Sequence, residues 1–146
     1  MSTVAQILQT KHDKSVYTIP PDVPVLDAVR LMAEKGIGAL LVVREDEQIA
    51  GIMTERDYAR KVVLHGRASS QTPVRDIMTS SVMYVRPENT VHECMALMTE
   101  NRLRHLPVLD NGNLVGLISI GDLVKDIISE QRFIIEQLEH YIMGQR

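Results

Sequence analysis

Apolar positions along the chain follow two different periods, and these periods occur in the same order in each half of the sequence. In each half, four apolar residues recur at positions i, i+3, i+4 and i+7, the spacing of a helix with one buried face. These residues are Val25, Ala28, Val29 and Met32 in the first half and Val91, Cys94, Met95 and Met98 in the second. The sequence therefore predicts one amphipathic helix in each half. The predicted N-cap is Asp22 in the first helix and either Asn89 or Thr90 in the second.

Short apolar runs of strand length surround each predicted helix. The runs Val16–Ile19 and Val82–Val85 precede the helices, and prolines end both runs. Two further runs, separated by a polar turn, follow each helix. They are Ala39–Val43 and Ile49–Met53 in the first half, and Leu106–Leu109 and Leu114–Ile118 in the second. Because a second helix is expected to begin near Thr54 and near Ser119, each half has the order strand, helix, strand, strand, helix.

The two halves are copies of one unit. A shift of the sequence against itself places Pro21 on Pro87 and, further along, Gly51 on Gly116. The lead-in before each unit repeats as well, with Val4, Ile7 and Leu8 corresponding to Val74, Ile77 and Met78. Helices cover one face of each small sheet, so the other face needs a partner. We predict an α+β fold of tandem βαββα repeats that pack sheet to sheet. The predicted domains are residues 4–66 and 74–128, followed by a C-terminal helix extension at 129–146.

Composition narrows the classes of function. Hydrophobic residues make up 45% of the 146 residues and charged residues 24%, with a net charge of −3. Aromatic residues make up only 3%, which disfavours stacking on single-stranded nucleic acid, and the net charge attracts neither polyphosphate nor anionic lipid. The single cysteine, Cys94, is expected to be a buried apolar residue. Since no segment is typical of a leader or a membrane span, we expect a cytoplasmic protein that binds neither nucleic acid nor membrane.

Two matching segments carry the candidate chemistry. Gly51–Asp57 and Gly116–Asp122 each end a predicted strand, place a hydroxyl residue at a helix start and place an aspartate three residues later. One interpretation is a capping box, with the carboxylate in the first turn, where the helix dipole favours it. The other is a ligand site, because a hydroxyl and a carboxylate at this spacing can bind a ribose diol beside N–H groups that favour phosphate.

The other candidate residues give no sign of catalysis. His12, His65 and His140 are isolated in the sequence, and His92 is expected to be solvated. No histidine spacing suits a metal ion, and no nucleophile motif is present. The pair Arg60-Lys61 is expected on an exposed helix face. We therefore predict no enzyme activity and no metal requirement, since an enzyme such as a nucleotide hydrolase would lack a positioned base.

The repeated Gly-x-x-Ser/Thr-x-x-Asp segments and the stretch Arg104–Asp110 resemble the signature of cystathionine-β-synthase-type (CBS) domains. The resemblance covers nearly all of Val4–Ile128, and the chain is similar to stand-alone proteins with a single CBS pair. It implies a Bateman module, in which the two repeats pack with pseudo-twofold symmetry and form two clefts that bind adenosine derivatives. AMP is the first candidate, with ADP, ATP, S-adenosylmethionine or NAD(H) as alternatives. Such a module would be a regulatory sensor that acts on an unknown effector protein in trans. The alternative function is a ligand-free interaction scaffold whose motifs are only helix caps.

The resemblance also assigns residues to the two clefts. In the first cleft, Ser119 and Asp122 would hold the ribose. Arg104 and His105 would reach the phosphate. The residues that would border the adenine are Tyr17, Ile37, Gly38 and Leu117. In the second cleft, the ribose pair would be Thr54 and Asp57, and the base would lie among Ile52, Met83 and Leu103.

The two clefts are predicted to differ in charge. Gly38 and Ala39 stand in the first repeat where Arg104 and His105 stand in the second. The second cleft therefore lacks a cationic pair, and we expect ligands with phosphate to prefer the first. The candidate replacements for the missing charge are Arg56, Arg60 and Arg102.

The last segment, Leu123–Met143, is predicted to be a helix with a seven-residue apolar period. The residues that recur at this spacing are Ile127, Ile134 and Tyr141, and Ile128, Ile135 and Ile142, with Leu138 between the two rows. This period is typical of a helix–helix seam and predicts a homodimer. The alternative is that the segment packs on the sheet of its own domain.

Overall fold

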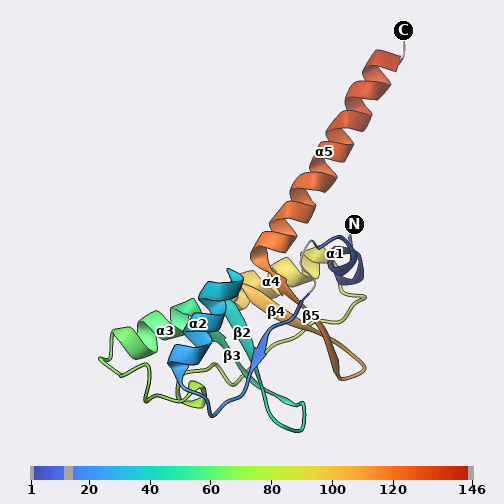
Figure 1. Cartoon of the computed structure of the whole chain (residues 1–146). Helices are drawn as coiled ribbons and strands as arrows, with labels where there is room; N and C mark the ends of the chain where they lie inside the picture. The colour runs from blue at the N-terminus through green and yellow to red at the C-terminus, as the bar shows by residue number, and fades with distance from the viewer. Residues whose placement is uncertain (1, 12–14, 145–146) are drawn as a thin grey trace. The chain divides into compact units, whose positions relative to one another are not determined.

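The computed structural model describes residues 2–11 and 15–144, which form two compact units (Figure 1). The central unit consists of residues 15–83, and the terminal unit consists of the described residues within 1–14 and 84–146. Each unit contains one small sheet together with helices, so the predicted α+β class is confirmed. The units do not follow the sequence repeats 4–66 and 74–128. Each unit instead combines the body of one repeat with the lead-in of the other.

The central unit contains a three-stranded sheet in the order β1-β2-β3. Its strands are β1 (Thr18–Ile19), β2 (Ala39–Val43) and β3 (Ile49–Thr54), and its helices are α2 (Val25–Lys35), α3 (Glu55–Tyr58), the π-helix η1 (Ala59–Val63) and the 3-10 helix η2 (Val74–Asp76). β1 is parallel to β2, and β2 is antiparallel to β3. The apolar face of α2 buries Val25, Ala28 and Met32 in the core of this unit, as its periodicity predicts.

The terminal unit is built around a two-stranded antiparallel sheet. Its elements are α1 (Val4–Thr10), α4 (Val91–Asn101), β4 (His105–Asp110), β5 (Asn113–Ser119) and α5 (Ile120–Gly144). Asn111 and Gly112 take φ values of 51° and 82° in the turn between the strands, which explains the Asn-Gly pair found there. Cys94 of α4 is fully buried in the core, so its predicted structural role is confirmed.

The predicted strand Val82–Val85 is wrong. Of this segment only Val85 pairs with β4, through a single parallel bridge to Val108. In the central unit the equivalent pairing extends one residue further, from Thr18 to Leu41. The residue that corresponds to Leu41 in the second repeat is Pro107, which has no N–H to donate, so the ladder stops at one bridge.

The helix caps differ in how they are satisfied. The predicted cap Asp22 is wrong, because α2 begins after Pro24, which makes no side-chain cap. The first N–H groups of α2 instead donate to the carbonyls of a loop far along the chain, with Val25 N 2.7 Å from Thr72 O. In α4 the N-cap is Thr90, one of the two predicted candidates, and Glu93 completes a capping box with it.

Each lead-in crosses a strand of its unit at a glycine. A Cβ atom added to Gly51 of β3 would lie 2.7 Å from the backbone oxygen of Thr79 and 2.8 Å from Met78 Sδ. A Cβ atom added to Gly116 of β5 would lie 2.7 Å from Leu8 Cδ2. Leu8 and Met78 occupy corresponding positions of the two lead-ins. The first glycine of each repeated motif therefore allows the lead-in of the other repeat to approach the strand.

Helix α5 is 25 residues long, slightly longer than the predicted segment Leu123–Met143. Leu123 is buried in the core of the terminal unit, and Ile127 is partly buried against it. From Ile128 to Met143, the large apolar side chains of α5 are exposed in the single chain. The alternative that this segment packs on its own sheet is therefore wrong beyond Ile127. Among the described residues, no helix combines the length and hydropathy that a membrane crossing needs.

Candidate functional site

The two repeated motifs form the same reciprocal cap at a strand–helix junction. In the central unit, Asp57 N lies 3.1 Å from Thr54 Oγ1, and Asp57 Oδ2 accepts from Thr54 N at 3.0 Å. In the terminal unit, Asp122 N lies 3.2 Å from Ser119 Oγ, and Asp122 Oδ2 accepts from Ser119 N at 2.9 Å. The capping-box interpretation is thus correct for both motifs as local geometry. Each cap holds one hydroxyl and one carboxylate side by side.

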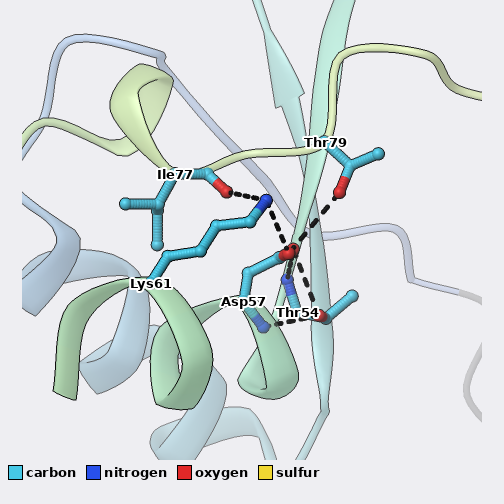
Figure 2. A network of polar contacts seen from close by, with 5 residues as sticks. All are labelled: Thr54, Asp57, Lys61, Ile77 and Thr79. Atoms are coloured by element: carbon cyan, nitrogen blue, oxygen red, sulfur yellow. Dashed lines mark hydrogen bonds and ion pairs between the residues drawn. The ribbon is translucent and has the colours of Figure 1, made fainter. Parts of the chain in front are cut away.

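In the central unit, a lysine and a second threonine add to the cap (Figure 2). Lys61 Nζ lies 3.1 Å from Asp57 Oδ1 and donates to the carbonyl oxygen of Ile77 at 2.9 Å. Thr79 Oγ1 lies 3.5 Å from the same carboxylate oxygen. Asp57 is only 8% exposed, so its charge is buried beside a cation that the backbone of η2 and its following loop helps to position.

The terminal unit contains a lysine in the same role, from an unrelated position in the sequence. Lys11 Nζ, which follows α1, lies 2.9 Å from Asp122 Oδ2 and donates to the carbonyl oxygen of Leu117 at 2.7 Å. In the repeat, the position that corresponds to Lys61 is Asp126, so the two lysines are not related by the duplication. Both carboxylates are nevertheless held by an ammonium group that also bonds a backbone carbonyl.

Sequence reasoning missed both lysines. For Lys61 a signal was available, because Asp57 and Lys61 are four residues apart and such pairs meet on a helix surface. Arg60 is exposed, as expected, and the Lys61 side chain is 44% exposed but also contacts Asp57. For Lys11 no local signal exists, since its carbonyl partner Leu117 is 106 residues away.

The two carboxylates differ in how fully they are bonded. Asp57 Oδ2 accepts from both the N–H and the hydroxyl of Thr54, and Asp57 Oδ1 contacts Lys61 and Thr79. An ionised carboxylate has about four acceptor positions, so Asp57 has none to spare. Within the described residues, Asp122 is bonded only through Oδ2, by Ser119 N and Lys11. Asp122 Oδ1 therefore keeps acceptor capacity that Asp57 lacks.

Two further residues of the predicted first cleft lie next to the Asp122 cap. His105 opens β4 directly opposite Ser119 in the strand register, and the carbonyl of Arg104 accepts from Ile120 N at 2.8 Å. Burial lowers the pKa of His105, and the charges of Lys11 and Arg104 lower it further, while Asp122 acts in the opposite direction. His105 is thus a neutral hydrogen-bonding group at neutral pH, and the exposed Arg104 side chain carries the permanent charge.

In the central unit, a pocket of about 670 Å³ lies beside α2, α3 and η1. It is mostly apolar, and its lining includes Ile37, Gly38, Tyr58 and Val63. The Glu55 side chain of α3 lies close to Gly38, since a Cβ atom added to Gly38 would lie 2.9 Å from Glu55 Oε1. Ile37 and Gly38, predicted to border the adenine of the first cleft, thus line a pocket beside α3, the helix that Thr54 caps.

The remaining predicted residues are divided between the units. Tyr17, Ile52 and Met83 belong to the central unit, and Leu103 and Leu117 belong to the terminal unit. Their exposures differ: Ile52 is buried, Met83 is exposed, and the other three are partly buried. The Tyr17 ring also lies under the ammonium of Lys35, 5.4 Å from the ring centre.

The candidate replacements for the missing charge near Asp57 are exposed side chains. Arg56 and Arg60 are solvent exposed on α3 and η1, and Arg102 is the exposed C-cap of α4. Among the described residues of the central unit, Asp57 has no hydrogen bond or ion pair with Arg56 or Arg60, whereas Lys61 contacts it directly. Lys61 is therefore the cation next to this cap.

His65, His92 and His140 are exposed, as expected, and His12 lies outside the described residues. Across residues 2–11 and 15–144, no group of three histidine, cysteine, aspartate or glutamate side chains is arranged to hold a metal ion. Burial raises the pKa of the Cys94 thiol to about 11, which suits an unreactive core residue.

Comparison with known proteins agrees with these motifs. The sequence profile of the CBS domain matches residues 4–64 and 74–129. The mitochondrial CBS domain-containing protein CBSX3 of Arabidopsis thaliana is 41% identical over 150 residues, which cover 98% of this chain and 73% of that protein. The structure of a protein with CBS domains from Burkholderia ambifaria, described as a signal-transduction protein, is 62% identical with a TM-score of 0.85, and the match covers 89% of this chain and 96% of that one.

A more distant structure has the same fold. The CBS domain pair of protein MJ0100, determined in complex with 5′-methylthioadenosine and S-adenosyl-L-methionine, matches with a TM-score of 0.78 at 21% identity, over 89% of this chain and 98% of that one. At this identity the likeness concerns the fold alone. Both repeats, both Gly-x-x-Ser/Thr-x-x-Asp motifs and the profile match across most of the sequence lead to one assignment. The chain belongs to the CBS domain family, whose domain pairs are regulatory modules.

Proposed function

We propose that this chain is a sensor of adenine nucleotides that regulates an effector protein in trans. The observation that carries the proposal is the lysine beside each cap. A helix cap needs only the hydroxyl and the carboxylate. Lys61 and Lys11 place a partly exposed cation beside each aspartate, more than a cap requires, and a carboxylate beside a cation is suited to charge-assisted hydrogen bonds from a ribose diol.

In the proposed first site, Ser119 and Asp122 bind the ribose. Within the described residues, Asp122 accepts hydrogen bonds only through Oδ2, which supports this role, because a diol could bind Oδ1 without displacing an internal donor. Arg104 would bind phosphate through its guanidinium fork, with neutral His105 as an additional hydrogen-bonding group. Tyr17, Ile37, Gly38 and Leu117 would border the adenine.

In the proposed second site, Thr54 and Asp57 bind the ribose, and the base lies among Ile52, Met83 and Leu103. Since the acceptor positions of Asp57 are already occupied, a diol has to displace an internal donor, and the 3.5 Å contact from Thr79 is the weakest of these. This exchange reduces the net gain from binding. We therefore infer that the second site binds the same nucleotide more weakly than the first.

AMP is the proposed ligand, with ATP and NAD(H) as the alternatives, and no metal ion is required. The single arginine of the first site suits one phosphate better than three. The complex of the MJ0100 domain pair with two adenosine derivatives supports an adenosine ligand in this fold, although its residues are too different to indicate which one.

Regulation would follow from a difference in affinity between two states of the module. A ligand shifts an equilibrium only as far as it binds one state better, and coupling of about 1–3 kcal/mol is typical. The proposed sensor works in the cytoplasm as a homodimer and catalyses no reaction. The competing function is an interaction scaffold with empty clefts, for which both motifs would serve only as helix caps.

Isothermal titration calorimetry with AMP separates the two functions. We expect Asp122→Ala to weaken AMP binding at least tenfold, because it removes a charge-assisted hydrogen bond of about 1.5–3 kcal/mol. Asp57→Ala should affect only the weaker site. Asp126→Ala is the matched control, since it removes the same charge one turn further along α5, and it should leave the affinity unchanged. Unchanged binding by a folded Asp122→Ala protein would refute the ribose assignment, and a wild-type protein that binds no adenine nucleotide would favour the scaffold.

A further inference from the structure

The second half of α5 exposes a continuous apolar surface. Figure 1 shows the C-terminal part of α5 extending away from the other elements of the terminal unit. Ile128, Ile135, Leu138 and Ile142 are 44%, 53%, 58% and 66% exposed. Burial of leucine and isoleucine side chains is favourable, so a row of them rarely stays in water without a partner.

These side chains follow a regular spacing along the helix. Together with two neighbours they form what we call the α5 stripe: Val124, Ile128, Gln131, Ile135, Leu138 and Ile142. The intervals alternate between four and three residues, which is the heptad spacing of a two-helix seam. Isoleucine occupies every a position (128, 135 and 142), and Val124, Gln131 and Leu138 occupy the d positions. Isoleucine at every a position is typical of parallel two-stranded coiled coils, and Leu138 supplies the leucine that such coils favour at d.

The charges on α5 argue against a lipid partner. The charged residues of the helix are Asp122, Asp126, Glu130, Glu136 and Glu139 on the acidic side and Lys125 and Arg132 on the basic side. Helices that lie on membranes carry lysine and arginine on their polar face, because the lipid surface is anionic. The excess of carboxylates on α5 would be repelled there.

Gln131 indicates which helix pairs with the stripe. A side-chain amide both donates and accepts hydrogen bonds, so a glutamine can bond its own copy. In a parallel pair in register, Gln131 meets Gln131, and each isoleucine of the stripe meets the same isoleucine. A single polar residue in such a seam specifies register at some cost in stability. Within the described residues, α5 is the helix that carries this heptad spacing, so a second α5 is the partner that matches it.

We propose that α5 pairs with α5 of a second copy of this chain, in parallel and in register, along the α5 stripe. The pairing rests on the homodimer proposed above and names the surface that joins its two chains. The seam would extend from Val124 to Ile142, about 27 Å at 1.5 Å per residue.

Sedimentation equilibrium of two matched variants tests the surface. Leu138→Asp places a charge in the seam and should halve the mass of the wild-type dimer. Phe133→Asp is the control, because Phe133 is 61% exposed on the same helix but lies outside the stripe, and it should keep the wild-type mass. Both residues are exposed in the single chain, so neither change affects the core. A dimeric Leu138→Asp protein would overturn the proposed surface, whereas a monomeric wild type would overturn the homodimer itself.

Disulfide cross-linking tests the orientation. In a parallel pair in register, Leu138→Cys faces its own copy and should form a covalent dimer on mild oxidation. In an antiparallel pair, residue 138 of one chain faces residue 128 of the other, so Leu138→Cys alone would stay uncross-linked. Phe133→Cys and the wild type, whose only thiol is the buried Cys94, are the controls and should remain single chains. Absence of the Leu138→Cys dimer would overturn the parallel arrangement.

Discussion

Replacing Gly51 by alanine should destabilise the central unit, because the backbone of the second lead-in crosses β3 at this residue. The added Cβ would lie 2.7 Å from Thr79 O and 2.8 Å from Met78 Sδ. The methionine sulfur can move, but the carbonyl cannot move freely. Thr79 is held by two hydrogen bonds to Ile52, at 2.9 Å through its oxygen and 2.8 Å through its nitrogen.

The magnitude follows from two opposing effects. Overpacking against a fixed group costs about 1–3 kcal/mol. Alanine restricts the unfolded chain more than glycine does, which stabilises the folded state by about 0.4–1 kcal/mol wherever the native backbone suits alanine. The backbone of Gly51 suits alanine, because Gly51 is not among the residues with positive φ. We therefore expect Gly51→Ala to lower the free energy of unfolding by about 1–2 kcal/mol.

Gly116→Ala is the matched control at the same position of the other repeat. Its Cβ would meet only the end of the Leu8 side chain, at 2.7 Å, and Leu8 is partly exposed and can turn away. Urea denaturation followed by circular dichroism should show a lower midpoint for Gly51→Ala and a change within about 0.5 kcal/mol for Gly116→Ala. Equal losses in both variants, or none in Gly51→Ala, would refute the argument that a fixed backbone oxygen, and not a mobile side chain, makes glycine necessary.

Two further predictions concern the terminal unit. Arg104→Ala should weaken AMP binding about tenfold or more and leave adenosine binding nearly unchanged, because only the phosphate engages the guanidinium. Paired calorimetric titrations of the two ligands measure this difference. Equal losses for both ligands would show that Arg104 acts through packing. For His105 the pKa is lowered in the folded state relative to its ordinary value of 6.5, so the unfolded state binds the proton first as the pH falls. The free energy of unfolding should therefore decrease as the pH drops below about 6.5, and urea titrations of His105→Gln should show a shallower decrease; the same slope in both proteins would contradict this assignment.

The sequence by itself determined the duplication, most of the secondary structure and both caps. β2 begins and ends at the residues expected, since an uninterrupted apolar run of five residues is too short for a buried helix and its valines favour a strand. The caps of Thr54 with Asp57 and of Ser119 with Asp122 join residues three apart, so local geometry is enough to predict them. The CBS resemblance rests on these local patterns, and the comparisons confirm it.

Tertiary structure decided the features that join distant parts of the chain. The carbonyls of residues 69 and 72 replace the cap expected from Asp22, and Pro107 stops a strand that the apolar run Val82–Val85 indicated. Lys11 reaches Asp122 because the first lead-in packs in the unit of the second repeat. The spacing of apolar residues does not indicate in which unit a lead-in packs. Local propensities act within a few residues, whereas these contacts depend on which segments the folded chain brings together.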